Sequence, residues 1–434
     1  MNSYRQAISF LYGLQQFGMK FGLSGIRALL REVGNPHKRI KSIHVAGTNG
    51  KGSVASMVAS IFTAAGYKTA LYTSPHLIDF TERIRINGRT IPHSRMLDLV
   101  RRLRPVVEKR RATFFETATA MAFRYFADER VDLAVIETGL GGRLDATNVM
   151  RPLVSVITNI EVEHVEILGK SVELIAVEKA GIIKPRIPCV TGVQSQRALQ
   201  TVRRIAAEKK SRVVQFDPLS TFIHGSSLHG LTVDLSGGQH EYRGIHVSLA
   251  GEFQARNAGI AVLAAEIAAE RGGFFVAETA VRTGLGHIQS LSGLNARLSV
   301  VQDHPLILAD VAHNPDAVQT LVDALRREDV KRVVLVFGVV RDKNFRSMIA
   351  SLSQLTARAI LVRPQTARAR DIRDLEKEFR RRRVPAMGAS SVREGLAVAK
   401  RLRLPYPILI TGSNFVVGEA LAVLRGKKYL TISQ

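Results

Sequence analysis

The stretch GTNGKGS, residues 47–53, has the residue types of a loop that binds phosphate. Its glycines let backbone N–H groups approach an anion, while Lys51 and Ser53 add a positive charge and a hydroxyl. The spacing departs from the common pattern G-x-x-x-x-G-K-[ST], because Gly52 separates the lysine from the serine. These residues alone leave two interpretations open, a nucleotide loop and a flexible turn that holds a lysine.

Other polar side chains follow further apolar, strand-like runs. Ser74 ends the run 68–74, and Glu137 lies in the run 132–138. The run 153–159 is followed by a group of acidic and imidazole side chains, namely Glu161, Glu163, His164 and Glu166. Ligands of open α/β sheets bind beyond the carboxyl ends of the strands, where oxygen ligands suit a hard cation. A tight turn or a salt bridge explains each feature alone, but their joint placement favours a site for a nucleotide triphosphate and magnesium.

To meet in this way, the residues need a mostly parallel sheet covered by helices. Apolar runs alternate with helical stretches from residue 40 onward, beginning with a strand at 42–47 and a helix at 53–65. A further helix is expected at 171–183, and it carries Lys179. Residues 218–250 are rich in Gly, Ser and His with short alternating runs, which predicts a small antiparallel insertion.

A second alternation of strands and helices follows. After a long helix at about 254–270, its strands are expected at 304–310, 332–338, 358–364 and 407–413. The sequence therefore predicts an α/β protein of two domains with a linker near 288–296. Residues 1–293 form a P-loop-type ATPase domain with a mostly parallel sheet, and residues 294–434 a smaller Rossmann-like domain.

Composition narrows the class of protein. The chain has 434 residues, 46% of them hydrophobic, and a single cysteine, Cys189, which excludes an internal disulfide and a cysteine-based metal site. No run of 18 uncharged apolar residues occurs, and the N-terminus lacks the layout of a signal peptide. We therefore expect a soluble cytoplasmic protein that does not engage a membrane.

The formal charge of +25 is large for such a protein. Much of it lies in arginine-rich runs at 101–105, 108–111 and 379–383, where it could attract nucleic acid or acidic metabolites. The runs lack interleaved aromatic residues, tryptophan is absent, and no nucleic-acid-binding signature occurs. A solvated basic surface is therefore favoured over specific nucleic-acid binding. Attraction of anionic substrates could use part of the positive charge, but it does not require a charge as high as +25.

Several longer stretches, in order along nearly the whole chain, point to one family. They are LYGLQQFGMKFGL (11–23), HVAGTNGKGS (44–53), YTSPHLIDFTERIRING (72–88), TFFETATAMAF (113–123), ETGLGGRLDATN (137–148), EKAGIIKP (178–185), NAGIAVLAAE (257–266), DVAHNP (310–315) and TGSNFVVGEAL (411–421). In these stretches the chain resembles folylpolyglutamate synthase/dihydrofolate synthase, a family of Mur-ligase-like, ATP-dependent, amide-forming enzymes. The unusual spacing of 47–53 is the rule in this family, where the loop binds ATP.

The resemblance implies an acid–amino-acid ligase that adds L-glutamate to dihydropteroate, to reduced folates or to both, through an acyl phosphate. Residues 1–293 would then bind ATP and the pterin, and residues 294–434 would be the glutamate-ligase domain. A monomer is expected. The positions that match ATP contacts in the family are Thr48, Asn49, Gly50, Lys51, Gly52, Ser53, Asn257, Arg297 and Asp310.

The resemblance also implies two magnesium ions. Ser74 and Glu137 match ligands of the first ion, and His164 matches a ligand of the second. Lys179 matches a lysine that the family carbamylates, and an anionic carbamate beside two divalent cations is electrostatically favourable where an ammonium is not. Lys51, His164 and Lys179 are thus the expected catalytic residues.

Two further groups match substrate-binding positions of the family. The pterin group consists of Met19, Lys20, Phe21, Phe115, Glu116, Arg143, Leu144, Asp145 and Ala146. His313 and Ser413 match positions at the glutamate.

Some positions depart from the family pattern. Glu163 replaces an aspartate before the metal histidine, Val311 replaces a glycine, and the interdomain stretch reads SGLNAR, with Ser299 near the place of a glutamate. These departures leave open a second interpretation, a different Mur-like ligase that acts on another carboxylate substrate. A third interpretation, a basic nucleic-acid-binding protein, is less favoured. The sequence does not tell which folate form or glutamate chain length is preferred.

Overall fold

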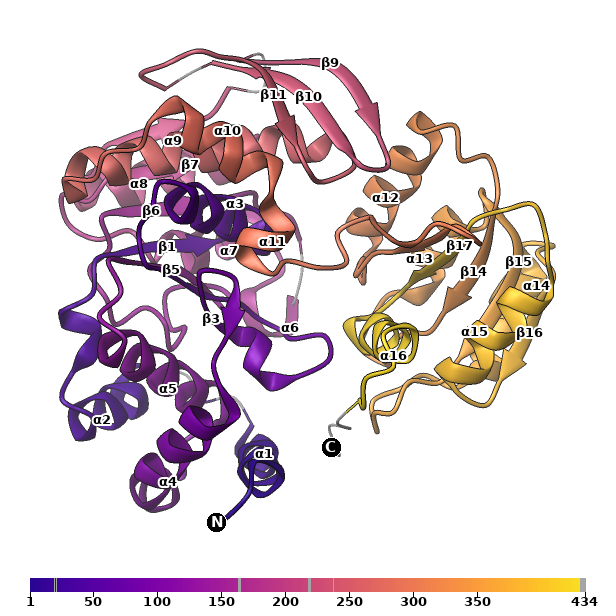
Figure 1. The fold of residues 1–434 in the computed structure, drawn as a ribbon, viewed down its shortest axis with the longest axis horizontal. Coiled ribbons are helices and arrows are strands. Elements are labelled where there is room, and N and C mark those ends of the chain that lie inside the picture. The colour runs from indigo at the N-terminus through magenta and orange to yellow at the C-terminus, as the bar shows by residue number, and fades with distance from the viewer. Residues whose placement is uncertain (19, 21, 163–164, 218–219, 237, 430–434) are drawn as a thin grey trace.

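The structure, a computed structural model, describes residues 1–18, 20, 22–162, 165–217, 220–236 and 238–429. Figure 1 shows two α/β halves side by side, each built around its own sheet, with a small antiparallel sheet above the first. This confirms the expected fold class.

The first sheet has the strand order β4-β3-β2-β5-β1-β6-β7-β8. It is parallel from β2 to β8, and β3 and β4 add an antiparallel edge. Every residue of β1 and β5 is buried, as expected where helices cover both faces of a parallel sheet. The strands are β1 (Ser42–Ala46), β2 (Thr69–Tyr72), β3 (Ile84–Ile86), β4 (Arg89–Thr90), β5 (Leu133–Glu137), β6 (Val154–Ile157), β7 (Cys189–Thr191) and β8 (Val213–Gln215).

Helices bury both faces of this sheet. On one face α3 packs with α9, α10 and α11, on the other lie α1, α2, α4 and α5, and α7 packs on α8. The helices are α1 (Tyr4–Gly13), η1 (Leu14–Phe17), α2 (Ser24–Glu32), η2 (Pro36–Lys38), α3 (Lys51–Ala64), η3 (Phe80–Arg83), α4 (His93–Arg110), α5 (Phe114–Asp128), α6 (Val165–Leu168), α7 (Val172–Ala180), α8 (Gln196–Glu208), α9 (Phe253–Gly272), α10 (Glu278–Gly286) and α11 (Ile288–Ser292).

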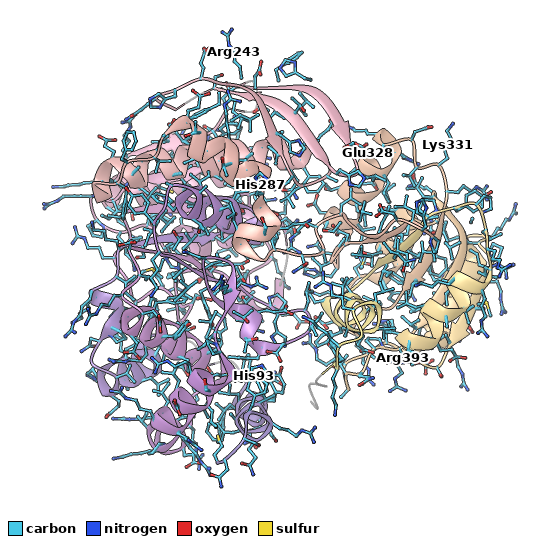
Figure 2. The ribbon with its side chains drawn as sticks, viewed as in Figure 1. His93, Arg243, His287, Glu328, Lys331 and Arg393 are labelled. Atoms are coloured by element: carbon cyan, nitrogen blue, oxygen red, sulfur yellow. The ribbon has the colours of Figure 1, made fainter. Side chains whose placement is uncertain are left out.

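The predicted insertion is a three-stranded antiparallel sheet of β9 (Thr221–Ser227), β10 (Gly230–Leu235) and β11 (Tyr242–Val247). It lies over α9 and α10, and the end of its hairpin reaches the second half (Figure 1). There the Ser226 hydroxyl donates to Glu328, whose position Figure 2 shows beside the hairpin. Arg327 pairs with Glu252 nearby. The insertion therefore connects the two halves.

The second sheet has the order β12-β13-β17-β14-β15-β16 and is parallel except for β12. Its strands are β12 (Ser299–Gln302), β13 (Ile307–Ala309), β14 (Val333–Phe337), β15 (Thr356–Val362), β16 (Ala386–Ala389) and β17 (Ile408–Thr411). Its helices are α12 (Pro315–Arg327), α13 (Phe345–Leu352), α14 (Ile372–Arg381), α15 (Val392–Arg401) and α16 (Asn414–Leu424).

The structure differs from the expected linker in one respect. Residues 288–292 form helix α11, because Ile288 is fully buried in the core of the first half. The irregular connection is therefore shorter than 288–296 and begins at Gly293, which follows α11 in a left-handed conformation.

The structure bears on two expectations from composition, the basic surface and the lack of a membrane-spanning helix. Arg243, Lys331 and Arg393 point outward on different sides of the molecule (Figure 2), as a distributed basic surface requires. None of the helices in the described part of the chain has both the length and the apolar character needed to cross a bilayer.

Candidate active site

A cavity of about 480 Å³ lies where the carboxyl ends of the two sheets meet. Thirteen residues expected to bind ATP, magnesium or substrate, or to act in catalysis, line it, namely Thr48, Asn49, Gly50, Lys51, Gly52, Ser53, Ser74, Glu137, Lys179, Asn257, Arg297, Asp310 and His313, and Glu161 from the acidic group after residue 159 lines it as well. The fold thus brings together residues that are up to 265 positions apart (48 to 313) in a single space.

The surroundings of Gly50 and Gly52 account for the unusual spacing of the glycine loop. Gly50 has φ +81° directly before α3, and a Cβ there would lie 2.8 Å from Asn257 Oδ1. A Cβ at Gly52 would lie 3.1 Å from Arg297 Nη2 and 3.8 Å from both carboxylate oxygens of Glu137. The glycine between the lysine and the serine therefore leaves room for an arginine from the second half to approach the N-terminus of α3, where an anion is stabilised.

Two lysines converge on this loop. Lys51 Nζ donates to Gly47 O at 2.9 Å and to Thr48 O at 2.8 Å. Lys179, on α7, is only 1% exposed, and its Nζ donates to the same Gly47 O at 2.7 Å. Two ammonium groups at one carbonyl oxygen repel each other, so an anion bound between them is strongly favoured.

Ser74 and Glu137 form the part of the expected metal site that lies within the described residues. The Ser74 N–H donates to Glu137 Oε2 at 3.0 Å, and Glu137 is 3% exposed. Burial raises the pKa of Glu137, while Lys51, the Ser74 N–H and Arg297 oppose that rise. His164 lies outside the described residues.

These groups fit magnesium. A carboxylate and a hydroxyl offer hard oxygen atoms, and Mg²⁺ commonly completes such a set with waters and phosphate oxygens. Within the described ranges no three His, Cys, Asp or Glu side chains gather around one point.

The second half contributes Asp310 and His313, whose side chains contact nearby backbone groups of the same half. Asp310 accepts from the N–H groups of Leu298 and Ala312, each at 2.7 Å, and burial raises its pKa. His313 Nδ1 lies 2.9 Å from Val311 O. The carboxylate of Asp310 therefore ties the connection between the halves to the loop that carries His313.

Asn49 links the two halves across the cavity. Its backbone N–H donates to Asn159 Oδ1 at 2.7 Å within the first half. Its side-chain amide donates to Asp316 Oδ2 at 2.8 Å, and its carbonyl oxygen accepts from Asn314 Nδ2 at 3.3 Å. The phosphate loop is thus in direct contact with the N-terminus of α12.

The expected pterin residues lie beside the cavity rather than in its lining. Phe115 packs against Gly139, where a Cβ would lie 2.5 Å from the ring, and its ring centroid is 6.1 Å from that of Tyr72. Glu116 Oε2 accepts from the Thr113 N–H at 2.9 Å in the capping box of α5, a local structural role.

The remaining pterin residues shape the loop after β5. Asp145 accepts from the N–H groups of Gly139 and Leu140, both at 2.9 Å, and next to it in the sequence lie half-buried Leu144 and buried Ala146.

Three other expected residues make contacts outside the cavity. Arg143 Nη2 pairs with Glu178 at 2.7 Å, and Lys20 Nζ donates to Arg111 O at 2.7 Å. Ser413 is 2% exposed and caps α16 by accepting from the Val416 N–H at 3.2 Å, whereas its neighbour Asn414 lines the cavity. Met19 and Phe21 lie outside the described residues.

The cavity also contains residues that the sequence did not single out as site residues. They include Thr158, Asn159, Gln194, Phe253, Arg256, Asp316, Thr320, Leu321 and Asn414. The position of Thr158 and Asn159 directly after β6 is a signal that could have identified them. Phe253, Arg256 and Thr320 lie on helices, where no sequence pattern distinguishes them from other surface residues.

Comparison with known proteins gives consistent results. Two family models match, the Mur ligase middle domain over residues 45–265 and the Mur ligase, glutamate ligase domain over residues 296–414. The chain is 38% identical over 363 residues to the dihydrofolate synthase/folylpolyglutamate synthase of Bacillus subtilis, an alignment that covers 81% of this chain and 83% of the relative.

Solved structures agree over the full length. A Mycobacterium tuberculosis folylpolyglutamate synthase complexed with ADP is 31% identical, with a TM-score of 0.88 over 98% of this chain and 100% of that one. An FPGS–AMPPCP–folate complex is 31% identical, with a TM-score of 0.81 over 97% of this chain and 99% of that one. The likeness therefore includes both halves.

Proposed function

We propose a residue-level mechanism for this chain, which belongs to the dihydrofolate synthase/folylpolyglutamate synthase family of Mur ligases. The chain is an ATP- and magnesium-dependent ligase that adds L-glutamate to dihydropteroate, reduced folates or both. The acceptor carboxylate attacks the γ-phosphorus of ATP to give an acyl phosphate and ADP. The glutamate amine then attacks the acyl carbon, and the amide forms as phosphate leaves.

The phosphates of ATP lie over the glycine loop in this proposal. The N–H groups at the start of α3 and the Lys51 ammonium bind them, and Arg297 reaches the same place over Gly52. These groups stabilise negative charge that develops during phosphoryl transfer. Two magnesium ions, held by Ser74, Glu137 and His164 together with phosphate oxygens, supply Lewis-acid polarisation when bound.

Lys179 is proposed to act as a carbamate. The buried ammonium would release one proton to give the neutral amine, and a second proton leaves as that amine adds carbon dioxide, so that a cation is replaced by an anion. The support is local, since the ammonium of Lys51 donates to the same Gly47 carbonyl oxygen as Lys179 does. A carbamate there replaces repulsion with attraction and adds an oxygen ligand for a cation.

The substrates divide between the halves in this proposal. Residues 1–293 bind ATP and the pterin, which lies along Phe115 and the loop 139–146, while Met19 to Phe21 and Glu116 complete its surroundings. Residues 294–434 bind glutamate near His313 and Ser413, and Asn257, Arg297 and Asp310 contact ATP. We also propose a monomer in the cytoplasm.

The observation that carries the proposal is the shared cavity. Lys51, Glu137 and Lys179 enter it from the first half, and Arg297 and His313 enter it from the second. The test is ADP release with magnesium and ATP, comparing dihydropteroate plus glutamate with tetrahydrofolate plus glutamate. Turnover of either pair is expected, and it would also reveal which step the enzyme serves. Folded protein that turns over neither pair would contradict the proposed acceptor.

A further inference from the structure

Arg83, at the end of η3, is a buried cation without a carboxylate partner. The residue is 7% exposed, and within the described part of the chain no carboxylate lies within salt-bridge distance of it. The nearby Glu82 carboxylate is occupied, because it accepts from the N–H groups of Leu77 at 2.9 Å and Ile78 at 3.2 Å. The carboxylates of Glu82 and Glu137 act on this cation without a salt bridge, so an anion in direct contact would compensate its charge further.

The guanidinium is fixed in place on one side only. Its Nε donates to His76 Nδ1 at 2.8 Å, and His76 Nε2 lies 3.1 Å from the Tyr12 hydroxyl. Its Cζ lies 5.2 Å from the centre of the Phe114 ring. Neither Nη1 nor Nη2 makes a hydrogen bond to a described residue, and neither is among the fully enclosed polar atoms of that part of the chain. Two parallel N–H donors in this position match a carboxylate.

Arg83 also lies between the two parts of the proposed site. Its carbonyl accepts from the Thr73 N–H at 3.1 Å, next to Ser74. It is one of the cations that oppose the raised pKa of Glu137, and its guanidinium lies over Phe114, which precedes Phe115 at the start of α5. The acceptor's carboxylate has to occupy this region if its pterin lies along Phe115.

We propose that Arg83 is a positioning and specificity residue that binds a carboxylate of the acceptor, an inference that rests on the acceptor site proposed above. The ion pair between Arg83 and the acceptor carboxylate would offset the repulsion between that carboxylate and the phosphates of ATP. Two sources share this chemistry, the reacting carboxylate of dihydropteroate and the α-carboxylate of a glutamylated folate.

The test is a comparison of ligands and variants. Binding of pteroate and of its methyl ester is measured without ATP and magnesium, by titration calorimetry. Wild-type protein should prefer pteroate by about tenfold or more, and Arg83→Met should bind both equally. Arg83→Lys keeps the positive charge but loses the two parallel N–H donors of the guanidinium. This variant should recover part of the preference for pteroate over its ester. An undiminished preference in Arg83→Met would overturn the proposal, and equal binding of pteroate and its ester by the wild type would exclude the reacting carboxylate as the group at Arg83.

Steady-state kinetics separate the two sources. Arg83→Met should raise the acceptor KM by about 10- to 100-fold with little change in the KM of ATP or glutamate. A rise for both acceptors places the reacting carboxylate at Arg83, and a rise for tetrahydrofolate alone places the α-carboxylate there. No rise for any acceptor that the wild type uses would contradict the inference while leaving the ligase function intact.

Arg85 provides the matched control. It is also 7% exposed, and its Nε has no partner among the described residues, but it lies against Gly293 at the connection between the halves. Arg85→Met should therefore share any loss of stability without changing the preference for pteroate. Since the ligand comparison on wild-type protein needs no variant, the proposal stays testable if Arg83→Met fails to fold.

Discussion

The carboxyl ends of the two sheets carry different kinds of polar group. At the first sheet the side chains hold charge in buried or half-buried positions, as buried Lys179 and half-buried Lys51 do at Gly47 O and buried Glu137 does at the Ser74 N–H. At the second sheet Asn314 and Ser413 cap helices α12 and α16. In the proposed mechanism the first edge stabilises phosphoryl transfer, and the second, with two capped helix N-termini, binds the carboxylates of an amino acid.

The strongest way to break this comparison is to remove charge from the first edge. Lys179→Ala should lower kcat by about 10³-fold or more, because the proposed carbamate acts where charge develops. Acetate should restore part of the activity, since it can supply the missing carboxylate. The measurement is ADP release, with exposed Lys170→Ala as the control in the same segment. An undiminished Lys179→Ala would remove the lysine from the mechanism.

A smaller effect on catalysis is expected at Gly52, where Arg297 from the second half approaches the glycine loop of the first. Gly52→Ala places a Cβ 3.1 Å from Arg297 Nη2, so the end of the arginine has to shift by a few tenths of an ångström. The KM for ATP should rise by about 30-fold with the acceptor KM unchanged. The control is Gly13→Ala, because Gly13 has φ −58° and no atom within 4 Å of an added Cβ. An unchanged KM for ATP would mean that Arg297 does not serve the loop.

The second edge should respond in glutamate binding. Ser413→Ala should raise the glutamate KM by about tenfold while the KM of ATP stays the same. Ser391 is a matched control, because it caps α15 in the same way, accepting from the Glu394 N–H at 3.2 Å. Both variants should lose about 1 kcal/mol of stability, as N-cap serines commonly do. Equal kinetics for the two variants would confine Ser413 to a capping role.

The smallest expected effect is a pH dependence in the second half. Burial raises the pKa of Glu419 from 4.5 to about 7. Because the folded state holds the proton more tightly, stability is lost as the pH rises from about 4.5 to about 7. Glu419→Gln should be more stable than wild type by about 1 to 2 kcal/mol at pH 8 and equal to it at pH 4. Thermal unfolding at both pH values measures this, and parallel shifts at both would contradict the assignment.

The sequence predicted what local pattern determines. The loop 47–53 and Glu137 were recognisable, because a glycine loop before a helix and a carboxylate after an apolar run identify the ends of parallel strands. The strand at 42–47 was placed within one residue of β1. Cavity residues that depend on helices from distant segments, such as Phe253 and Arg256, were not found, since periodicity does not tell which neighbour a helix face meets.

Other residues show a different kind of limit. Glu116 matched a pterin position, yet its carboxylate is engaged in the capping box with Thr113, a pattern that the spacing T-x-x-E already contains. The guanidinium of Arg83 has no carboxylate partner within the described residues, and this is a property of three-dimensional packing alone. The sequence can identify candidates for chemistry, and the contacts decide which of them remain available to a ligand.

The division of labour between the two edges is tested most directly by trapping the acyl phosphate with hydroxylamine in the absence of glutamate. The amount of acceptor hydroxamate formed with ATP and magnesium is measured by mass spectrometry for wild type, Ser413→Ala and Lys179→Ala. The account predicts wild-type yields for Ser413→Ala and none for Lys179→Ala. Equal loss of hydroxamate in both variants would show that the second edge is needed for phosphoryl transfer and would contradict the account.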